Sequence, residues 1–196
     1  TITGLELAEA DTTGDGGAVR IVGGNVSVIE SRLRDNKSSG DGGAISVTSG
    51  SLSIENSAFD NNHSADDGGA VAALSSVFQD VGSTFAGNQG VRGGAVLLEA
   101  SNATVLHTFL LENMASDAGG GIQMVGGTIA MQGAILWSNT AVNGGGGASL
   151  TDVDDDAIFM RNNRFQDNDG GSVGGGLALR GSDAQLTVSN NTFTGN

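Results

Sequence analysis

Residues 42–62 have the sequence GGAISVTSGSLSIENSAFDNN, and this stretch decides the fold. After the Gly-Gly-Ala start, apolar Ile45 and Val47 alternate with polar residues. A second alternating run follows, and Phe59 stands three residues before Asn62. A hydrophobic period of two is typical of half-buried strands. The stretch therefore predicts short strands separated by turns.

This motif recurs along almost the whole chain, and two sets of regularly spaced residues mark it. Glycine pairs begin at Gly16, Gly42, Gly68, Gly93, Gly119, Gly145 and Gly174. A second column consists of Asn36, Asn62, Asn88, Asn113, Asn139, Asn168 and Asn196. Most steps are 25 or 26 residues, and steps of 28 or 29 occur only toward the C-terminus. Two independent columns with one period indicate an internal repeat of supersecondary structure.

Equivalent residues at equivalent positions indicate parallel strands stacked in register, with successive coils about 4.8 Å apart. We therefore predict an all-β fold, a right-handed single-stranded parallel β-helix with three short strands per coil. It has about seven coils of about 26 residues, because each repeat forms one coil of a solenoid. We expect residues 1–196 to form a single domain, part of a longer chain or a stacking unit.

The repeated residues have mechanical roles in this prediction. A Gly-Gly pair permits positive φ and close stacking of turns. Asn tolerates the left-handed region and can bond to its neighbours above and below as a ladder. The run around Val77, Phe78 and Val81 alternates poorly, so this coil fits less well. Ala72 and Leu97 are expected to face outward as a modest apolar strip.

Composition excludes several classes of function. The net charge is −14 with only 8 Lys and Arg, which argues against nucleic-acid binding. The chain has no Cys, so disulfides and thiolate metal sites are excluded. No apolar stretch is long enough for a transmembrane helix. Neither end has the polar cap that a solenoid needs, so we expect either more coils or end-to-end association of copies.

Carboxylates before the glycine pairs are candidate metal ligands. Asp15, Asp41 and Asp67 occupy one column, and stacking would place them about 5 Å apart. Such a column could bind Ca²⁺, which takes several carboxylate oxygens. It could also form a glycosidase pair, because retaining enzymes hold two carboxyls about 5–5.5 Å apart. The favoured interpretation is structural, with each Asp bonding amides of its own turn.

The enlarged coil holds a second acidic group. Asp152, Asp154, Asp155 and Asp156 lie in an insertion, where solenoids place surface loops. These residues could bind Ca²⁺, although a solvated acidic loop is favoured. Arg161 and Arg164 follow in the same coil, so the ingredients of a calcium-dependent polysaccharide lyase are present. Trp137 is the only Trp and the chain has no Tyr, which argues against sugar stacking.

The paired motifs resemble the repeats of chlamydial polymorphic outer-membrane proteins. The resemblance rests on residues 42–45 with 59–62 and on residues 68–71 with 85–88, and it extends from Gly16 to Asn196. Those proteins are autotransporters, so it implies a β-helical passenger exposed at the bacterial surface, with adhesion to a host or neighbouring-cell receptor or polysaccharide. We therefore expect a non-enzymatic, extracellular adhesive stalk without a required cofactor. The alternatives are a carbohydrate-binding or calcium-dependent polysaccharide-degrading β-helix and a self-assembling filament subunit.

Overall fold

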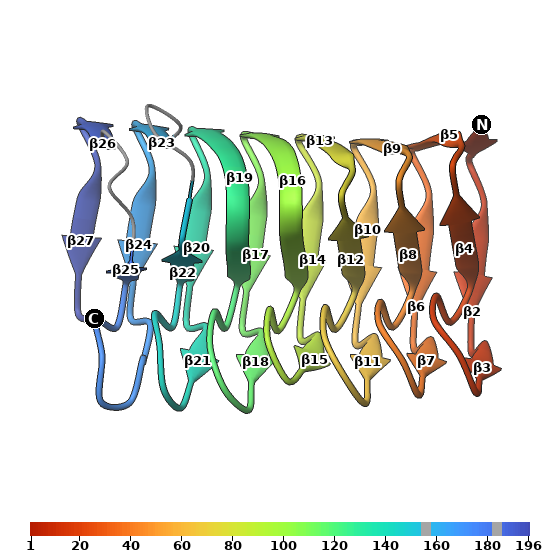
Figure 1. The fold of residues 1–196 in the computed structure, drawn as a ribbon, viewed down its shortest axis with the longest axis horizontal. Coiled ribbons are helices and arrows are strands. Elements are labelled where there is room, and N and C mark those ends of the chain that lie inside the picture. Colours follow the sequence, from red (N-terminus) through yellow and green to blue (C-terminus); the bar gives the residue numbers. More distant parts are fainter. Residues whose placement is uncertain (154–157, 182–185) are drawn as a thin grey trace.

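The computed structural model describes residues 1–153, 158–181 and 186–196, and these residues form a stack of coils (Figure 1). All paired strands are parallel, and each strand pairs with its counterpart in an adjoining coil. The predicted all-β, right-handed β-solenoid of about seven turns with three sheets is confirmed. No helix long and apolar enough to cross a membrane occurs in the described ranges.

The first sheet has 13 strands in the described residues, and most coils contribute two strands to it. A bend divides the two strands in most coils, whereas β16 and β19 run through without a break. Its strands are β1 (Ile2–Thr3), β4 (Val19–Val22), β5 (Asn25–Ile29), β8 (Ile45–Thr48), β9 (Ser51–Glu55), β12 (Val71–Leu74), β13 (Val77–Val81), β16 (Val96–Leu106), β19 (Ile122–Gln132), β22 (Ala148–Thr151), β23 (Ile158–Arg161), β25 (Leu177–Arg180) and β26 (Leu186–Ser189).

The other two sheets are narrower, with 8 and 6 strands in the described part of the chain. The second sheet contains β2 (Glu6–Ala8), β6 (Arg32–Arg34), β10 (Ala58–Asp60), β14 (Thr84–Ala86), β17 (Phe109–Leu111), β20 (Ile135–Trp137), β24 (Arg164–Gln166) and β27 (Thr192–Thr194). The third sheet contains β3 (Asp11–Thr12), β7 (Lys37–Ser38), β11 (His63–Ser64), β15 (Gln89–Gly90), β18 (Met114–Ala115) and β21 (Thr140–Ala141).

The core is a set of apolar columns inside the coils. The middle residue of each second-sheet strand points inward, and Phe59 stacks on Phe85 with ring centroids 4.7 Å apart. Phe165 stacks on Phe193 in the same column near the C-terminal end, at 4.6 Å. Phe59, Phe85 and Phe165 are buried by the coils on either side, whereas Phe193 in the last coil is 46% exposed, so a single coil has no core of its own.

The Gly-Gly turn before β12 covers the outer face of that strand. A Cβ atom added at Gly68 would lie 3.0 Å from the Cβ of Ala72, so the turn lies directly on this face. Ala72 and Leu97 are consequently 0% and 1% exposed. The expected outward apolar strip is therefore wrong, because the sequence pattern does not reveal which strand face a turn covers.

Candidate functional site

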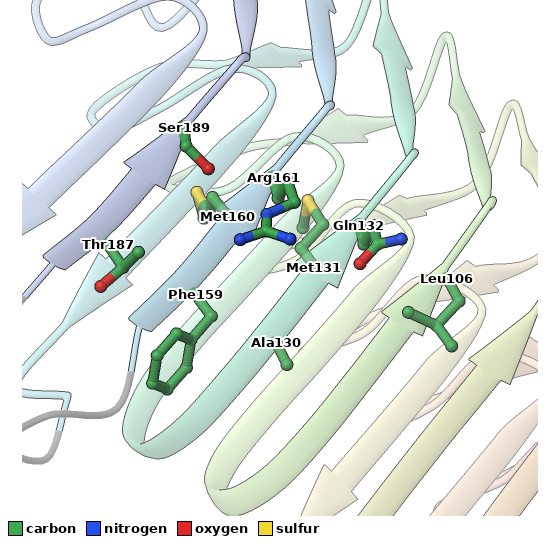
Figure 2. A pocket seen from close by; sticks show the side chains of 9 residues that line it. All are labelled: Leu106, Ala130, Met131, Gln132, Phe159, Met160, Arg161, Thr187 and Ser189. Atoms are coloured by element: carbon green, nitrogen blue, oxygen red, sulfur yellow. The ribbon is translucent and has the colours of Figure 1, made fainter.

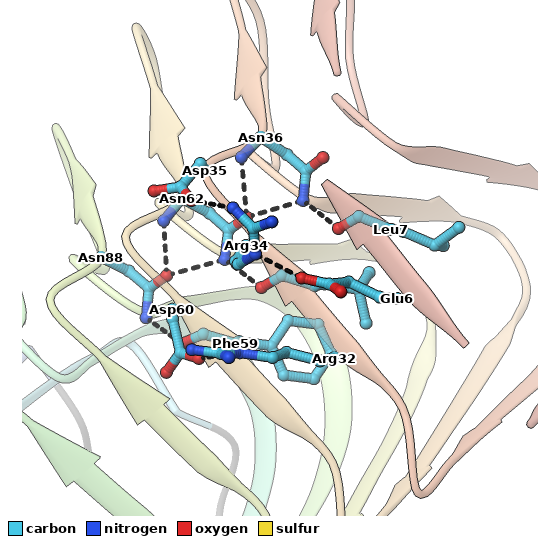
Figure 3. Close-up of polar contacts among 11 residues, drawn as sticks. Glu6, Leu7, Arg32, Arg34, Asp35, Asn36, Phe59, Asp60, Asn62 and Asn88 are labelled. Atoms are coloured by element: carbon cyan, nitrogen blue, oxygen red, sulfur yellow. Dashed lines mark hydrogen bonds and ion pairs between the residues drawn. The ribbon is translucent and has the colours of Figure 1, made fainter. Parts of the chain in front are cut away.

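The Asn column forms a continuous ladder at the corner between the second and third sheets (Figure 3). The Nδ2 atom of Asn62 donates to Oδ1 of Asn88 at 3.0 Å and to the carbonyl of Leu33 at 2.9 Å. The backbone N–H of Asn62 donates to the same Oδ1 at 2.9 Å. Asn62 is 1% exposed, so these bonds satisfy polar groups that have no access to water.

The same bonds recur at every step of the ladder from Asn36 to Asn196. The left-handed backbone does not fall on these residues, however. Positive φ is found one position earlier, for example at Asp35 and Asn61. The expectation that the ladder Asn itself adopts positive φ is therefore wrong. The residue with the left-handed backbone thus comes one position before the Asn whose side chain bonds to the next coil.

The glycine pairs occupy positions where a side chain has no room. The first glycine of each pair from Gly16 to Gly119 has positive φ, whereas Gly145 and Gly174 do not. A Cβ atom at Gly94, the second glycine of its pair, would lie 2.2 Å from the carbonyl oxygen of Gly120. Backbones of successive coils therefore approach closely at this turn, which only glycine permits.

The Asp column before the glycine pairs joins successive coils through backbone amides. Asp15 Oδ1 accepts the amide of Asp41 at 3.2 Å, and Asp41 Oδ1 accepts that of Asp67 at 3.3 Å. Asp67 accepts the Arg92 amide at 2.8 Å and pairs with the Arg92 guanidinium at 3.0 Å. Each Asp oxygen therefore accepts a hydrogen bond from an amide of the next coil, whereas the sequence suggested an amide of its own turn. Arg92 ends the column with a positive charge.

Three carboxylates approach one another at this turn. Ligand atoms of Asp41, Asp66 and Asp67 lie within 4.8 Å of one another. Burial, together with the negative charges of Asp67, Asp66 and Asp15, raises the pKa of Asp41. Such crowding suits a cation, but Arg92 already neutralises Asp67. Calcium binding by Asp15, Asp41 and Asp67 stays a prediction.

Only part of the acidic insertion lies within the described residues. Asp152 is exposed and has a positive φ of 49°. Asp154, Asp155 and Asp156 lie outside the described residues, so their calcium site stays a prediction. The group around Asp67 precedes β12, whereas Arg161 ends β23 several coils away. The described residues therefore do not bring the clustered carboxylates next to Arg161 as a lyase mechanism would require.

A hollow of about 180 Å³ lies on the outer face of the first sheet over β19, β23 and β26 (Figure 2). Ala130 is small, so the side chains on either side leave space above it. Phe159 stands beside this space with 53% of its surface exposed. Arg161 and Gln132 border it together, as Figure 2 shows. An apolar ring next to hydrogen-bond donors can hold a small polar ring such as a sugar.

Sequence reasoning missed a buried carboxyl in the coil that alternates poorly. In β13, Phe78 and Asp80 face inward, whereas Val77 and Val81 face outward. Asp80 is 0% exposed and stands in register with Ile54 and Val105 of the adjoining coils. The neighbouring coils fix this register, so the strand cannot turn its valines inward. The irregular alternation of apolar and polar residues in this strand was the sequence signal that could have revealed the buried carboxyl.

Asp80 is incompletely paired in the core. Its Oδ2 atom accepts a hydrogen bond from the Thr108 hydroxyl, and its Oδ1 atom has no partner among the described residues. Burial raises the pKa of Asp80 to about 6, although hydrogen bonds from Ser83 and Thr108 offset part of the rise. A carboxylate in this position is costly, because these hydrogen bonds compensate only part of the lost hydration.

Comparison with known proteins agrees with this architecture. A family model described as right-handed β-helix region matches residues 17–193, so the chain belongs to this family. No curated protein and no solved structure matches the chain. The family includes both enzymes of the pectate-lyase type and non-enzymes, so membership defines the architecture and leaves the activity open. The likeness to chlamydial surface proteins stays a prediction.

Proposed function

We propose that the chain is a non-catalytic β-helical stalk that holds an adhesive surface away from a bacterial cell. The observation that carries this proposal is the use of polar side chains to join one coil to the next. The ladder Asn residues and the Asp column are both committed to such contacts. Side chains that serve as mechanical links are held in place and are not free for chemistry.

Exposed polar side chains continue this pattern. Asn25 accepts the Ser51 hydroxyl at 2.8 Å, and Asn102 accepts the Thr128 hydroxyl at 3.0 Å. Arg32 pairs with Asp60 at 2.7 Å, one coil further along (Figure 3). Individual exposed pairs contribute little, but a row of them restricts sliding and bending of coils. A rod of this kind suits a spacer between a cell and its target.

A spectroscopic ruler tests the stalk. The chain has no Cys, so Ala8→Cys and Thr194→Cys allow two dyes to be attached without other changes. The two positions belong to one outward column and are separated by seven coil steps. We expect one narrow distance distribution centred near 34 Å, from about 4.8 Å per step. A broad distribution would contradict a rigid stalk.

A cleavage screen tests the non-catalytic part of the proposal. Acidic and neutral polysaccharides are incubated with the chain with and without Ca²⁺, and new chain ends are measured. We expect no turnover. Turnover that disappears in both Asp154→Asn and Arg161→Gln would establish the lyase alternative and end the proposal.

Carbohydrate binding is a second candidate, favoured by the hollow beside Phe159. We infer that a sugar ring would pack on the exposed Phe159 ring and accept hydrogen bonds from Arg161 and Gln132. Titration calorimetry with oligosaccharides tests this. Phe159→Ala should weaken binding at least about tenfold, as loss of an aromatic anchor does. Val77→Ala is the matched control, because Val77 lies on the same sheet face in the N-terminal half of the chain. Equal losses of affinity in the two variants would refute this site.

A further inference from the structure

The outer face of the second sheet changes character in the middle of the rod. Each strand places two side chains outward, and register aligns them in two columns. From the N-terminal to the C-terminal coil these pairs are Glu6 and Ala8, Arg32 and Arg34, Ala58 and Asp60, Thr84 and Ala86, Phe109 and Leu111, Ile135 and Trp137, Arg164 and Gln166, and Thr192 and Thr194. Among the described strands of this sheet, only β17 and β20 carry large apolar side chains at these positions, two on each strand.

These four residues, Phe109, Leu111, Ile135 and Trp137, form an apolar patch across two adjacent strands. Register places Phe109 beside Ile135 and Leu111 beside Trp137. Phe109 is 41% exposed and Trp137 is 38% exposed. The inward residues of the same strands fill the core, so the patch adds nothing to the interior. Contiguous exposed apolar side chains of this kind mark interaction sites.

An acidic ridge formed by Glu112 and Asp167 borders the patch on the side of Leu111 and Trp137, whereas Arg164 lies in register beside Ile135 on the other side. Glu112 follows Leu111 at the corner, and its amide donates to the carbonyl of Trp137 at 2.9 Å. One coil further, Asp167 accepts the indole N–H of Trp137 at 3.2 Å. Both carboxylates are exposed, and neither forms an ion pair with any described residue.

We propose that the apolar patch binds a protein segment that presents apolar side chains flanked by basic ones. Aromatic residues such as Trp and Phe are typical anchors of protein interfaces. The carboxylates of Glu112 and Asp167, which form no ion pair with the described residues, supply the complementary charge along one edge of the patch. This inference deepens the proposed function, because it names the adhesive surface and the chemistry of its partner.

Two other occupants fit less well. A second copy would bring the same acidic ridges together, and the net charge of −14 opposes that contact. A glycan would use flat aromatic faces, which Phe109 and Trp137 supply, but the other half of the patch consists of the branched aliphatic side chains of Leu111 and Ile135. A protein segment matches both the aliphatic character and the acidic border.

Trp137 provides the readout, because it is the only Trp and the chain has no Tyr. The probe is a short synthetic peptide in which Leu and Lys alternate, so that an extended strand has one apolar face. We expect a saturable blue shift of Trp137 emission that weakens with added salt. The matched control peptide, in which Glu replaces Lys, should bind at least about tenfold more weakly.

Variants locate the contact. Leu111→Ser combined with Ile135→Ser keeps the Trp137 reporter and should weaken peptide binding at least about tenfold. Val22→Ser removes an exposed apolar side chain from the first sheet, outside both candidate sites, and should leave the affinity unchanged. Thermal melting checks that both variants are folded. Equal binding by the double variant and the unchanged chain would overturn the proposal.

Further arms distinguish the other occupants. A shift produced by a neutral oligosaccharide and not by the Leu-Lys peptide would overturn the protein partner in favour of a glycan. A shift that appears on raising the protein concentration alone, with a dimer in sedimentation, would overturn it in favour of a second copy. The dye-ruler distance is measured in the same samples, so loss of peptide binding on an intact rod leaves the stalk standing.

Discussion

Two corners flank every strand of the second sheet, and they are built differently. The corner after the strand carries Asn in every coil from Asn36 onward, and each side chain makes the same bonds. The corner before the strand begins with Ser31 and Ser57, whose amides bond the next serine hydroxyl at 3.1 and 3.2 Å. We call these the asparagine corner and the serine corner.

The serine corner is not uniform. At Thr108 the hydroxyl donates to Asp80 as well as to the carbonyl of Leu106, at 3.3 Å. Two coils further the ladder resumes with Asn163, whose Oδ1 accepts the amide of Ala134 at 2.9 Å. The difference teaches that one uninterrupted ladder is enough to keep the coils in register. The second corner can then vary, and a buried carboxyl is tolerated beside it.

The largest expected effect concerns Asp80, at the point where the serine corner breaks. Asp80→Val matches the apolar residues above and below it, and should stabilise the fold by about 3 kcal/mol at pH 8. This follows from a pKa about two units above the unfolded value of 3.8, at about 1.4 kcal/mol per unit. Chemical denaturation at pH 8 measures the change. A loss of stability would show that the carboxylate has a partner that compensates its burial.

The same group predicts a pH dependence. Because the folded-state pKa lies above the unfolded one, protonation of Asp80 stabilises the fold as pH falls from about 6 toward 4. Ionisation removes this stabilisation above pH 6. The advantage of Asp80→Val should therefore shrink between pH 8 and pH 4, as measured by denaturation midpoints. Asp80→Asn, which stays neutral, serves as the control, and a constant difference between the unchanged chain and Asp80→Asn would contradict the assignment.

The next effect breaks the asparagine corner. Asn62→Ala removes an acceptor for Asn36 and donors to Asn88 and Leu33, and should destabilise the fold by about 1–3 kcal/mol, as unsatisfied buried polar groups do. Urea denaturation gives the value. Asn102→Ala, in an exposed bond, should cost less than about 0.5 kcal/mol. Equal costs for the two variants would remove the special role of the ladder.

A smaller effect is expected at the serine corner. Ser57→Ala takes away the acceptor of the Ser31 amide and should cost about 1 kcal/mol, as a single buried hydrogen bond does. The ratio of this cost to that of Asn62→Ala, measured under the same conditions, sharpens the comparison. A larger cost at Ser57 than at Asn62 would mean that the serine corner carries the register.

The uniform parts of this fold could be predicted from the sequence, because repetition makes each coil evidence for its neighbours. The glycine and asparagine columns indicated the stacking and the coil length. Residues that depart from the repeat could not be placed in the same way. Asp80 was missed because its orientation is imposed by strands in two other coils. The patch around Trp137 was missed because outward columns become visible only when register is known.

The candidate sites illustrate the same limit. The spacing of Asp15, Asp41 and Asp67 indicated a column, but it could not show that each oxygen faces the amide of the next coil. Nor could it show that Arg92 would neutralise Asp67. Side-chain direction at a turn depends on backbone angles that the repeat pattern does not encode.

Proton exchange of the asparagine side chains, followed by NMR, tests most directly whether coils are joined through a closed polar ladder. The account predicts that the Nδ2 protons of Asn62, Asn88 and Asn113 exchange as slowly as backbone amides of the core strands. Exposed Asn102 should exchange fast. Rapid exchange at all four side chains would show that water enters the corner, and would contradict the ladder as the source of cohesion.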